Sequence, residues 1–434
     1  LVIVESPAKA KTIEKFLGAD YVVKSSIGHI RDMPKKDMGV NIENDFQPTY
    51  AISADKKKVV ADLKKSAKTA EKIYLATDED REGEAIAWHL QQALSLAEDT
   101  PRIVFHEITK GAITDAISNP RTINTDLVNA QQARRIIDRL VGFEISPVLW
   151  RKISGARSAG RVQSPVVRLV VEREREISAH SPVSSYKVKA NLVNKSNQSL
   201  EVKLGKDFDS KEAAISFAED LLRSDLSVES IETKPSKRSP KAPFITSTLQ
   251  QEASQKLGFS VKQTMSIAQN LYREGAITYM RTDSLNLSEV AISAAEDEII
   301  SKYGKDFHQV RRYKTSSTGA QEAHEAIRPT DLTKPTILGL DDQSAKLYSL
   351  IYKRTLASQM SDAQLQKTKI NISISERSEN FIADGEILSF AGFLEVYDYI
   401  AAEDKLLPEV AKGDVLSLLD MSSRESFSRA KPRY

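Results

Sequence analysis

The sequence predicts an α/β domain, followed by helical domains and by a β-rich domain whose two parts are separated along the chain. Three observations lead to this fold class. Strand-like and helix-like runs alternate over residues 1–120. Apolar residues recur at helical spacing over 126–177 and again over about 245–364. Alternation of apolar and polar residues, which is typical of half-buried strands, occupies stretches before and after the second helical block.

The chain opens with a short buried strand, "LVIVE", at residues 1–5. A helix follows it, with Ser6 as the expected N-cap, Pro7 at the first helical position and Gly18 at the end. Strands that alternate with helices in this way form a mostly parallel sheet that helices cover on both faces. Further strands are expected at 21–27, 72–77 and 102–108, and further helices at 83–94 and 109–118.

The later strand patterns flank the second helical block. Two of them, at 186–193 and 226–234, precede it, and two more, at 366–375 and 414–421, follow it. We therefore expect one discontinuous β domain with a helical domain inserted into it. The expected domains are 1–120 (α/β), 121–180 (helical, first part), 181–244 (β-rich, first part), 245–364 (helical) and 365–434 (β-rich, second part).

Composition narrows the functional classes. The net charge of +2 is close to balance, so a nucleic-acid surface must come from local clustering, and residues 131–177 carry ten Lys and Arg against five Asp and Glu. The absence of cysteine excludes disulfides and thiolate zinc sites and fits a reducing compartment, the cytoplasm. No apolar run approaches the roughly 18 residues that a membrane span needs, so no membrane partner is expected. The chain starts without Met, and we expect it to be a fragment.

The most unusual stretch is "DEDREGE" at 78–84, with five carboxylates in seven positions. If the chain stays extended beyond the preceding strand, Asp78, Asp80 and Glu82 share one side, at the edge of the sheet where Glu5 also ends a strand. Unpaired acids at this density raise one another's pKa, and a hard divalent cation such as Mg²⁺ removes that penalty. The alternative is a solvated acidic turn with Arg81 as its local partner.

Lys9 lies beside these acids, in the first turn of the first helix. A helix N-terminus offers free N–H groups and positive potential to anions. Together with a metal site, this arrangement suggests phosphoryl transfer. The G-x-x-x-x-G-K-[ST] motif is absent, so an ATP-hydrolysing P-loop enzyme is not expected. The alternative for Lys9 is an ordinary surface lysine.

Two further stretches carry polar groups that suit phosphate chemistry. In "REGAITYMRTDS" (273–284), Tyr279 precedes Arg281 by two residues, and a nearby guanidinium lowers a phenol pKa and can hold a phosphate oxygen. In "AQEAHEAIRPTD" (320–331), His324 lies near Glu325 and Arg328. Each pattern alone is weak, because most tyrosines serve packing and a histidine beside carboxylates is more often structural.

Taken in order, these stretches resemble motifs of the type IA DNA topoisomerases, most closely those of the bacterial branch. The resemblance covers nearly the whole chain. It implies a Toprim α/β domain over 1–120, helical domains, and a discontinuous β-rich arch, in a toroidal core that is incomplete at its C-terminal end. The motifs read "VIVESPAKAKTI", "GHIRDMP", "DEDREGEAIAWHL", "QQARRIIDRLVGFEISPVLW", "SAGRVQS", "TLQQEASQKLGFS", "ITYMRTDS" and "QEAHEAIRPT".

The resemblance also implies roles for individual residues. Tyr279 matches the nucleophile that becomes joined to a DNA 5′-phosphate, Arg281 the arginine that positions that phosphate, and Lys9 the lysine that assists the leaving 3′-oxygen. The acids Glu5, Asp78, Asp80 and Glu82 match the Toprim set, of which the last three hold Mg²⁺ and Glu5 also serves in proton transfer. His324 matches a histidine near the active site. Residues implied in DNA binding are His29, Arg31, Arg134, Arg135, Asp138, Arg161 and Gln163.

The implied activity is ATP-independent relaxation of negatively supercoiled DNA by a monomer, through transient cleavage of one strand and a phosphotyrosine intermediate. The alternative is a truncated core that binds and cleaves single-stranded DNA without full relaxation. Two other classes remain open: a different Toprim phosphoryl-transfer enzyme, which needs no tyrosine, and a non-catalytic module that binds single-stranded DNA without Mg²⁺. Trapping a covalent DNA adduct distinguishes the first hypothesis from both.

Overall fold

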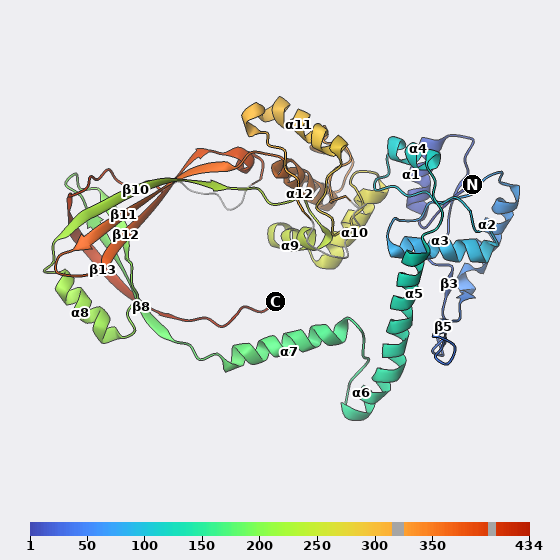
Figure 1. Cartoon of the computed structure of the whole chain (residues 1–434), viewed down its shortest axis with the longest axis horizontal. Helices are drawn as coiled ribbons and strands as arrows, with labels where there is room; N and C mark the ends of the chain where they lie inside the picture. Colours follow the sequence, from blue (N-terminus) through green and yellow to red (C-terminus); the bar gives the residue numbers. More distant parts are fainter. Residues whose placement is uncertain (315–324, 398–404) are drawn as a thin grey trace. The chain divides into compact units, whose positions relative to one another are not determined.

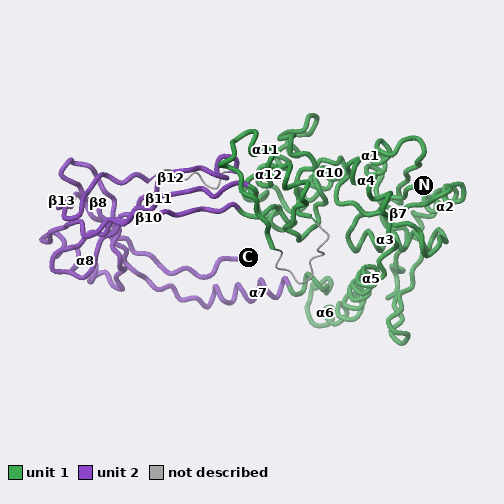
Figure 2. Tube along the Cα trace, turned by 45° about the horizontal axis from the view of Figure 1, so that its top comes forward, with its two compact units in different colours: residues 1–165, 241–359 green, residues 166–240, 360–434 purple. Residues whose placement is uncertain are grey.

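The computed structural model describes residues 1–314, 325–397 and 405–434. The chain divides into two compact units, and each is built from two separate segments (Figure 2). Unit 1 comprises Leu1–Pro165 and Lys241–Gln359, and unit 2 comprises Val166–Pro240 and Met360–Tyr434. The boundaries of the five domains expected from the sequence stay a prediction.

Unit 1 contains a three-stranded parallel sheet. Strand β1 (Val2–Val4) lies between β2 (Val23–Ser25) and β7 (Tyr74–Leu75). The three expected strands at these places are confirmed, although β7 is shorter than its apolar run. The strand expected at 102–108 is wrong: only a single bridge joins Arg102 to Leu75.

Helices cover both faces of this sheet, as the alternating pattern predicts. Ile3 packs in one cluster with Leu75 and with apolar residues of α2 and α3, while Val2 and Val4, which alternate to the opposite face, are equally buried. The helices of this part are α1 (Pro7–Leu17), α2 (Lys57–Thr69), α3 (Arg81–Leu94) and α4 (Lys110–Ser118), shown in Figure 1.

The rest of unit 1 is mostly helical. A long helix, α5 (Thr125–Leu140), continues through a π-helical turn (Val141–Ile145) into α6 (Ser146–Lys152). The second segment of the unit forms the helical block that the sequence predicts. Its helices are α9 (Thr246–Leu257), α10 (Val261–Arg273), α11 (Glu289–Tyr303) and α12 (Asp342–Ser358).

Unit 2 is a closed antiparallel barrel with strand order β10-β11-β12-β9-β8-β13, and the helix α7 (Gln163–Ala179) leads into it. Its strands come from both segments, and the four expected strands are confirmed as β8, β10, β11 and β13. Two strands of the barrel, β9 and β12, and the helix α8 were not expected from the sequence, and Phe217 of α8 packs into the barrel core. The elements are β8 (Ser184–Val193), β9 (Ser199–Leu204), α8 (Lys211–Leu221), β10 (Leu226–Arg238), β11 (Ala363–Ile374), β12 (Asn380–Phe390) and β13 (Val415–Phe427).

A search of the described residues found no helix long and apolar enough to cross a membrane.

Candidate active site

The acidic stretch does not continue the strand before it. Asp80 is the N-cap of α3, and its Oδ1 accepts a hydrogen bond from the N–H of Gly83 at 2.8 Å. The chain therefore turns helical at Arg81, and the expected extended backbone over Asp78, Asp80 and Glu82 is wrong. A capping aspartate offered a stronger local signal than the alternation of side chains.

The turn requires a glycine at its helical end. A Cβ on Gly83 would lie 2.0 Å from the carbonyl oxygen of Asp78, closer than any side chain can approach. The first turn of α3, at Gly83, is thus in direct contact with the backbone of Asp78. This contact fixes Asp78 at the edge of the sheet and Asp80 at the start of the helix.

A buried arginine stabilises the same turn through hydrogen bonds to its backbone. The guanidinium of Arg102 donates to the carbonyl oxygens of Thr77 (2.8 Å) and Asp78 (2.7 Å), and its Nε donates to the carboxylate of Glu84 at 3.2 Å. Glu84 accepts two further hydrogen bonds from the guanidinium of Arg121. Arg102 and Glu84 are both 0% exposed, so this ion-pair network is part of the interior. The network was not expected from the sequence: Glu84 belongs to the acidic stretch but was given no role, and Arg102 stands in none of the quoted motifs.

Lys9 lies between two of the expected acids. Its Nζ is 3.0 Å from Oδ1 of Asp78 and 3.3 Å from Oε2 of Glu5, and its side chain is fully buried. Burial lowers the pKa of Lys9, but the charges of Asp78 and Glu5 outweigh that effect and the net pKa is raised. Burial is the main reason that the pKa of Glu5 is raised to about 7. The positive charge of Lys9 opposes this increase, and the negative charge of Asp78 adds to it. The surface-lysine alternative is therefore wrong.

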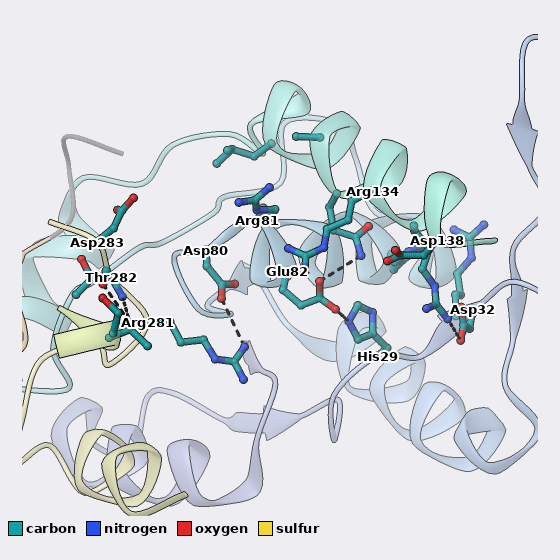
Figure 3. A pocket seen from close by; sticks show the side chains of 18 of the residues that line it. His29, Asp32, Asp80, Arg81, Glu82, Arg134, Asp138, Arg281, Thr282 and Asp283 are labelled. Carbon is teal, nitrogen blue, oxygen red and sulfur yellow. Dashed lines mark hydrogen bonds and ion pairs between the residues drawn. The ribbon is translucent and has the colours of Figure 1, made fainter. Parts of the chain in front are cut away.

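Tyr279 reaches the same acids from the second segment of unit 1. Its backbone N–H donates to the carbonyl oxygen of His106 at 2.9 Å, and its hydroxyl donates to Oδ2 of Asp80 at 2.6 Å. The guanidinium of Arg281 lies 3.9 Å from the same carboxylate oxygen (Figure 3). Sequence positions 199 residues apart thus share a hydrogen bond.

The expectation that Arg281 lowers the pKa of Tyr279 is wrong as a net effect. Burial, the charges of Asp78 and Asp80, and the hydrogen bond to Asp80 raise this pKa far above its usual value, and the opposing effect of Arg281 is smaller. Tyr279 is 2% exposed. The hydroxyl is therefore a neutral donor that points at a carboxylate.

Tyr272, on α10, completes this cluster and was missed by the sequence analysis. Its hydroxyl donates to Oδ1 of Asp78 at 3.4 Å, and its ring meets that of Tyr279 edge-on, with centroids 5.1 Å apart. Burial raises the pKa of Tyr272 well above its usual value. No motif pointed to it, because it lies just before the stretch that contains Tyr279.

The donor chemistry of the cluster suits a hard divalent cation. Glu5, Asp78 and Asp80 offer only carboxylate oxygens, which Mg²⁺ prefers, and the raised pKa of Glu5 reflects the crowding and burial that a cation would offset. Within the described parts of the chain, no three His, Asp or Glu side chains are gathered closely enough to form a metal-binding group.

Glu82, the fourth expected acid, lies apart from this cluster and contacts His29 Nε2 at 2.6 Å and Gln131 Nε2 at 3.2 Å. The hydrogen bond to His29 is the main reason that the pKa of Glu82 is lowered to about 2.

A pocket of about 1170 Å³ opens beside Asp80 and Arg281 (Figure 3). The first segment of unit 1 and the start of α9 both contribute to its walls. Of the residues expected to bind DNA, five line this pocket: His29, Arg31, Arg134, Arg135 and Asp138.

The two remaining described candidates lie close to this wall. Arg161 Nε is 2.9 Å from Oδ1 of Asp138. Gln163 donates to Ser158, which lines a neighbouring pocket of about 460 Å³. His324 lies outside the described residues, so its expected place near Tyr279 stays a prediction.

The pocket wall mixes paired and unpaired cations. Arg135 donates two hydrogen bonds of 2.8 Å to Asp32. Partial burial raises the pKa of Asp32, but these hydrogen bonds and the neighbouring positive charges together outweigh burial, and the net pKa is lowered. Arg31 and Arg134 form no ion pair with any residue that the structure describes, so both charges remain available to an anion. Asp32 was missed as a site residue, although the quoted "GHIRDMP" motif contains it.

Comparisons with known proteins identify the family of the chain. The profile of the DNA topoisomerase family matches residues 122–434, and that of the Toprim domain, a metal-binding domain, matches residues 1–108. DNA topoisomerase 1 of Streptomyces coelicolor is 45% identical over 100% of this chain and 52% of its own length. DNA topoisomerase 1 of Campylobacter jejuni is 46% identical over 100% of this chain and 64% of its own length.

A solved structure agrees as well. Full-length topoisomerase I from Thermotoga maritima superimposes with a TM-score of 0.88 at 39% identity, over 100% of this chain and 73% of that one. The chain spans about half the length of most of the curated relatives it matches. The family profiles, these relatives and this structure agree along the whole sequence, and the chain belongs to the bacterial type IA DNA topoisomerase family.

Proposed function

We propose that the protein cleaves and rejoins one strand of DNA through a covalent phosphotyrosine, and that it relaxes negatively supercoiled DNA by this reaction without ATP. One observation carries the proposal: the buried hydroxyl of Tyr279 donates to Asp80 at 2.6 Å, in a cluster that also holds the ammonium group of Lys9. Attack on a phosphodiester needs a nucleophile, a group that accepts its proton and positive charge near the phosphate. The buried phenol, the carboxylate beside it, the buried ammonium group and the arginine-lined pocket supply these.

The proposed cleavage step uses groups of this chain. The oxygen of Tyr279 attacks the phosphorus atom while its proton passes to Asp80. The bond from phosphorus to the 3′-oxygen breaks, and Lys9 gives that oxygen a proton. Arg281, whose side chain is more than half exposed, holds a non-bridging oxygen of the phosphate. One phosphodiester replaces another, so the step needs no nucleotide energy source.

Mg²⁺ is the proposed ion, and Asp78, Asp80 and Glu82, with Glu5 beside them, would hold it. When bound, the ion supplies Lewis-acid charge that aligns the 3′-hydroxyl for rejoining. For this, Glu82 has to give up its contact with His29, because that contact now directs its carboxylate into the pocket wall. Lys9 carries the positive charge beside Glu5 and Asp78, and the hydroxyl of Tyr279 donates a hydrogen bond to Asp80.

The proposed substrate is single-stranded or underwound DNA. The pocket beside Tyr279 is lined by Arg31, Arg134 and Arg135, and a groove that contacts one backbone from several sides excludes a paired second strand. Arg161 and Gln163 are proposed to contact the same strand, and His324 is proposed to act near Tyr279, as the family resemblance implies. We propose further that the protein acts as a monomer on DNA in the cytoplasm.

The decisive experiment is a denaturing gel of the chain with a 3′-labelled single-stranded oligonucleotide. The parent chain should form a covalent band, and Tyr279→Phe should lose it while binding the oligonucleotide with unchanged affinity, since only one hydroxyl is removed. Tyr348→Phe is the matched control: it removes the hydroxyl of another buried tyrosine, which donates to the carbonyl oxygen of Lys334. A covalent band with Tyr279→Phe would assign the chemistry to another nucleophile.

A further inference from the structure

We propose that Tyr272 is a positioning residue for strand cleavage, which holds Asp78 and the ammonium group of Lys9 beside Tyr279. The inference rests on the proposed function and extends it to a residue to which neither the sequence motifs nor the resemblance gave a role. Tyr272 touches no substrate atom in this role. It acts through the three groups that it contacts.

The hydroxyl of Tyr272 shares its acceptor with Lys9. It donates to Oδ1 of Asp78 at 3.4 Å, and Lys9 Nζ lies 3.0 Å from the same oxygen atom. The two donors come from α10 and α1, in different segments of unit 1. One carboxylate oxygen is therefore fixed from two sides, and the lysine that assists the leaving group is fixed with it.

The ring of Tyr272 restricts its neighbours as well. Lys9 Nζ lies 5.9 Å from the centroid of this ring and 4.8 Å from that of Phe105, so two aromatic faces stabilise the buried ammonium group. The ring also meets Tyr279 edge-on, at an interplanar angle of 69°. This contact limits the rotation of the attacking phenol, and orientation of a nucleophile contributes strongly to rate.

Simple core packing is the competing explanation. Tyr272 is 2% exposed, as expected of a tyrosine that only fills space. The two explanations differ in the role of the hydroxyl group. The hydroxyl of Tyr348, an equally buried tyrosine, donates to the backbone carbonyl of Lys334, whereas that of Tyr272 donates to a carboxylate of the reaction site. Removing the hydroxyl alone separates them.

The test compares the parent chain with Tyr272→Phe and with the control Tyr348→Phe. The single-turnover rate of covalent adduct formation on a 3′-labelled single-stranded oligonucleotide is measured in EDTA, so that only groups of the chain act. We expect Tyr272→Phe to form the adduct about tenfold more slowly, the effect of losing a hydrogen bond to a charged group. Its affinity for the oligonucleotide and its thermal midpoint should match those of the control.

Three results would overturn the inference: an unchanged rate, an equal loss of rate in Tyr348→Phe, or a loss of DNA affinity that accounts for the slower reaction. Tyr272→Leu adds a second measurement, because it removes the ring as well, and it should be slower than Tyr272→Phe. A parent chain that forms no adduct would instead contradict the proposed function. That outcome is recognisable because the parent and every variant would then behave alike.

Discussion

His89 should make the stability of unit 1 depend on pH in a defined window. Burial, followed by the charges of Arg31 and His29, lowers the pKa of His89 to about 3. The side chain is 2% exposed and packs against the rings of Tyr50 and Trp88, with centroid distances of 4.6 and 4.8 Å. Its Nδ1 has no hydrogen-bond partner within the described residues. The folded protein therefore keeps this imidazole neutral.

The magnitude follows from the difference between the two states. The unfolded chain binds a proton at His89 below pH 6.5, its ordinary pKa, while the folded chain does not until about pH 3. The free energy of unfolding is therefore highest above pH 6.5, where His89 is neutral in both states, and it decreases as the pH falls because only the unfolded chain gains the proton. Between pH 6.5 and pH 4.5 the loss is about 2.7 kcal/mol, at 1.36 kcal/mol per pH unit. Glu82, with its pKa of about 2, loses its own contribution only below about pH 4.5, so the two windows are separate.

The assay is urea unfolding at pH 7 and pH 4.5, followed by tryptophan fluorescence. Both tryptophans of the chain, Trp88 and Trp150, lie in unit 1, and Trp88 touches His89. His89→Leu removes the titration, so the variant should lose about 2.7 kcal/mol less than the parent between the two pH values. Taking each protein relative to itself at pH 7 cancels the groups that titrate in both. Equal losses in the two proteins would refute the reasoning.

Three further predictions concern the reaction and the turn that supports it. Asp80→Asn should slow adduct formation in EDTA by about 100-fold, because an amide cannot accept the proton of the attacking hydroxyl; a parent-like single-turnover rate would remove Asp80 from this role. Arg134→Ala should weaken binding of single-stranded DNA and reduce the slope of log affinity against log salt by about 0.7, measured by fluorescence anisotropy, whereas an unchanged slope would mean that Arg134 contacts no phosphate. Gly83→Ala should destabilise unit 1 by about 2 kcal/mol or more, because the new methyl group meets the carbonyl oxygen of Asp78 at 2.0 Å. Gly111→Ala, which has open space around it, is the matched control, and equal thermal midpoints for the two variants would contradict the close contact.

Local sequence patterns predicted whether most elements are helices or strands, but they could not predict which strands pair with one another. The Ser6 cap and the following proline gave α1 correctly, because capping is a property of neighbouring residues. The strand β12 was missed, since Asp384 and Gly385 interrupt its apolar alternation and its place depends on the flanking strands β11 and β9. Closure of the barrel pairs β8 with β13, more than 200 residues away, and no short window contains that information.

The candidate site shows the same division. Spacing brought Asp78 and Glu5 to one sheet edge, because parallel strands end there. The meeting of Tyr279 with Asp80 could be expected only from the family resemblance, since the two are 199 residues apart. The pKa of Tyr279 could not be predicted at all: it depends on burial between segments, and burial there outweighs the nearby guanidinium of Arg281.

The construction of each unit from two segments has a consequence for synthesis on the ribosome. Within this chain the last residue of unit 1 is Gln359, and when it has been added the barrel of unit 2 still lacks the strands β11, β12 and β13. Until these strands emerge, the nascent β10 cannot form its full-length pairing with β11, and an exposed strand edge invites association with other chains. Pro235, with Lys234 and Lys237 on either side, lies within β10, and proline and lysine are residues that discourage such edge pairing. The second half of β10 therefore carries residues that keep an unpaired strand soluble until its partner, β11, is synthesised more than 120 residues later.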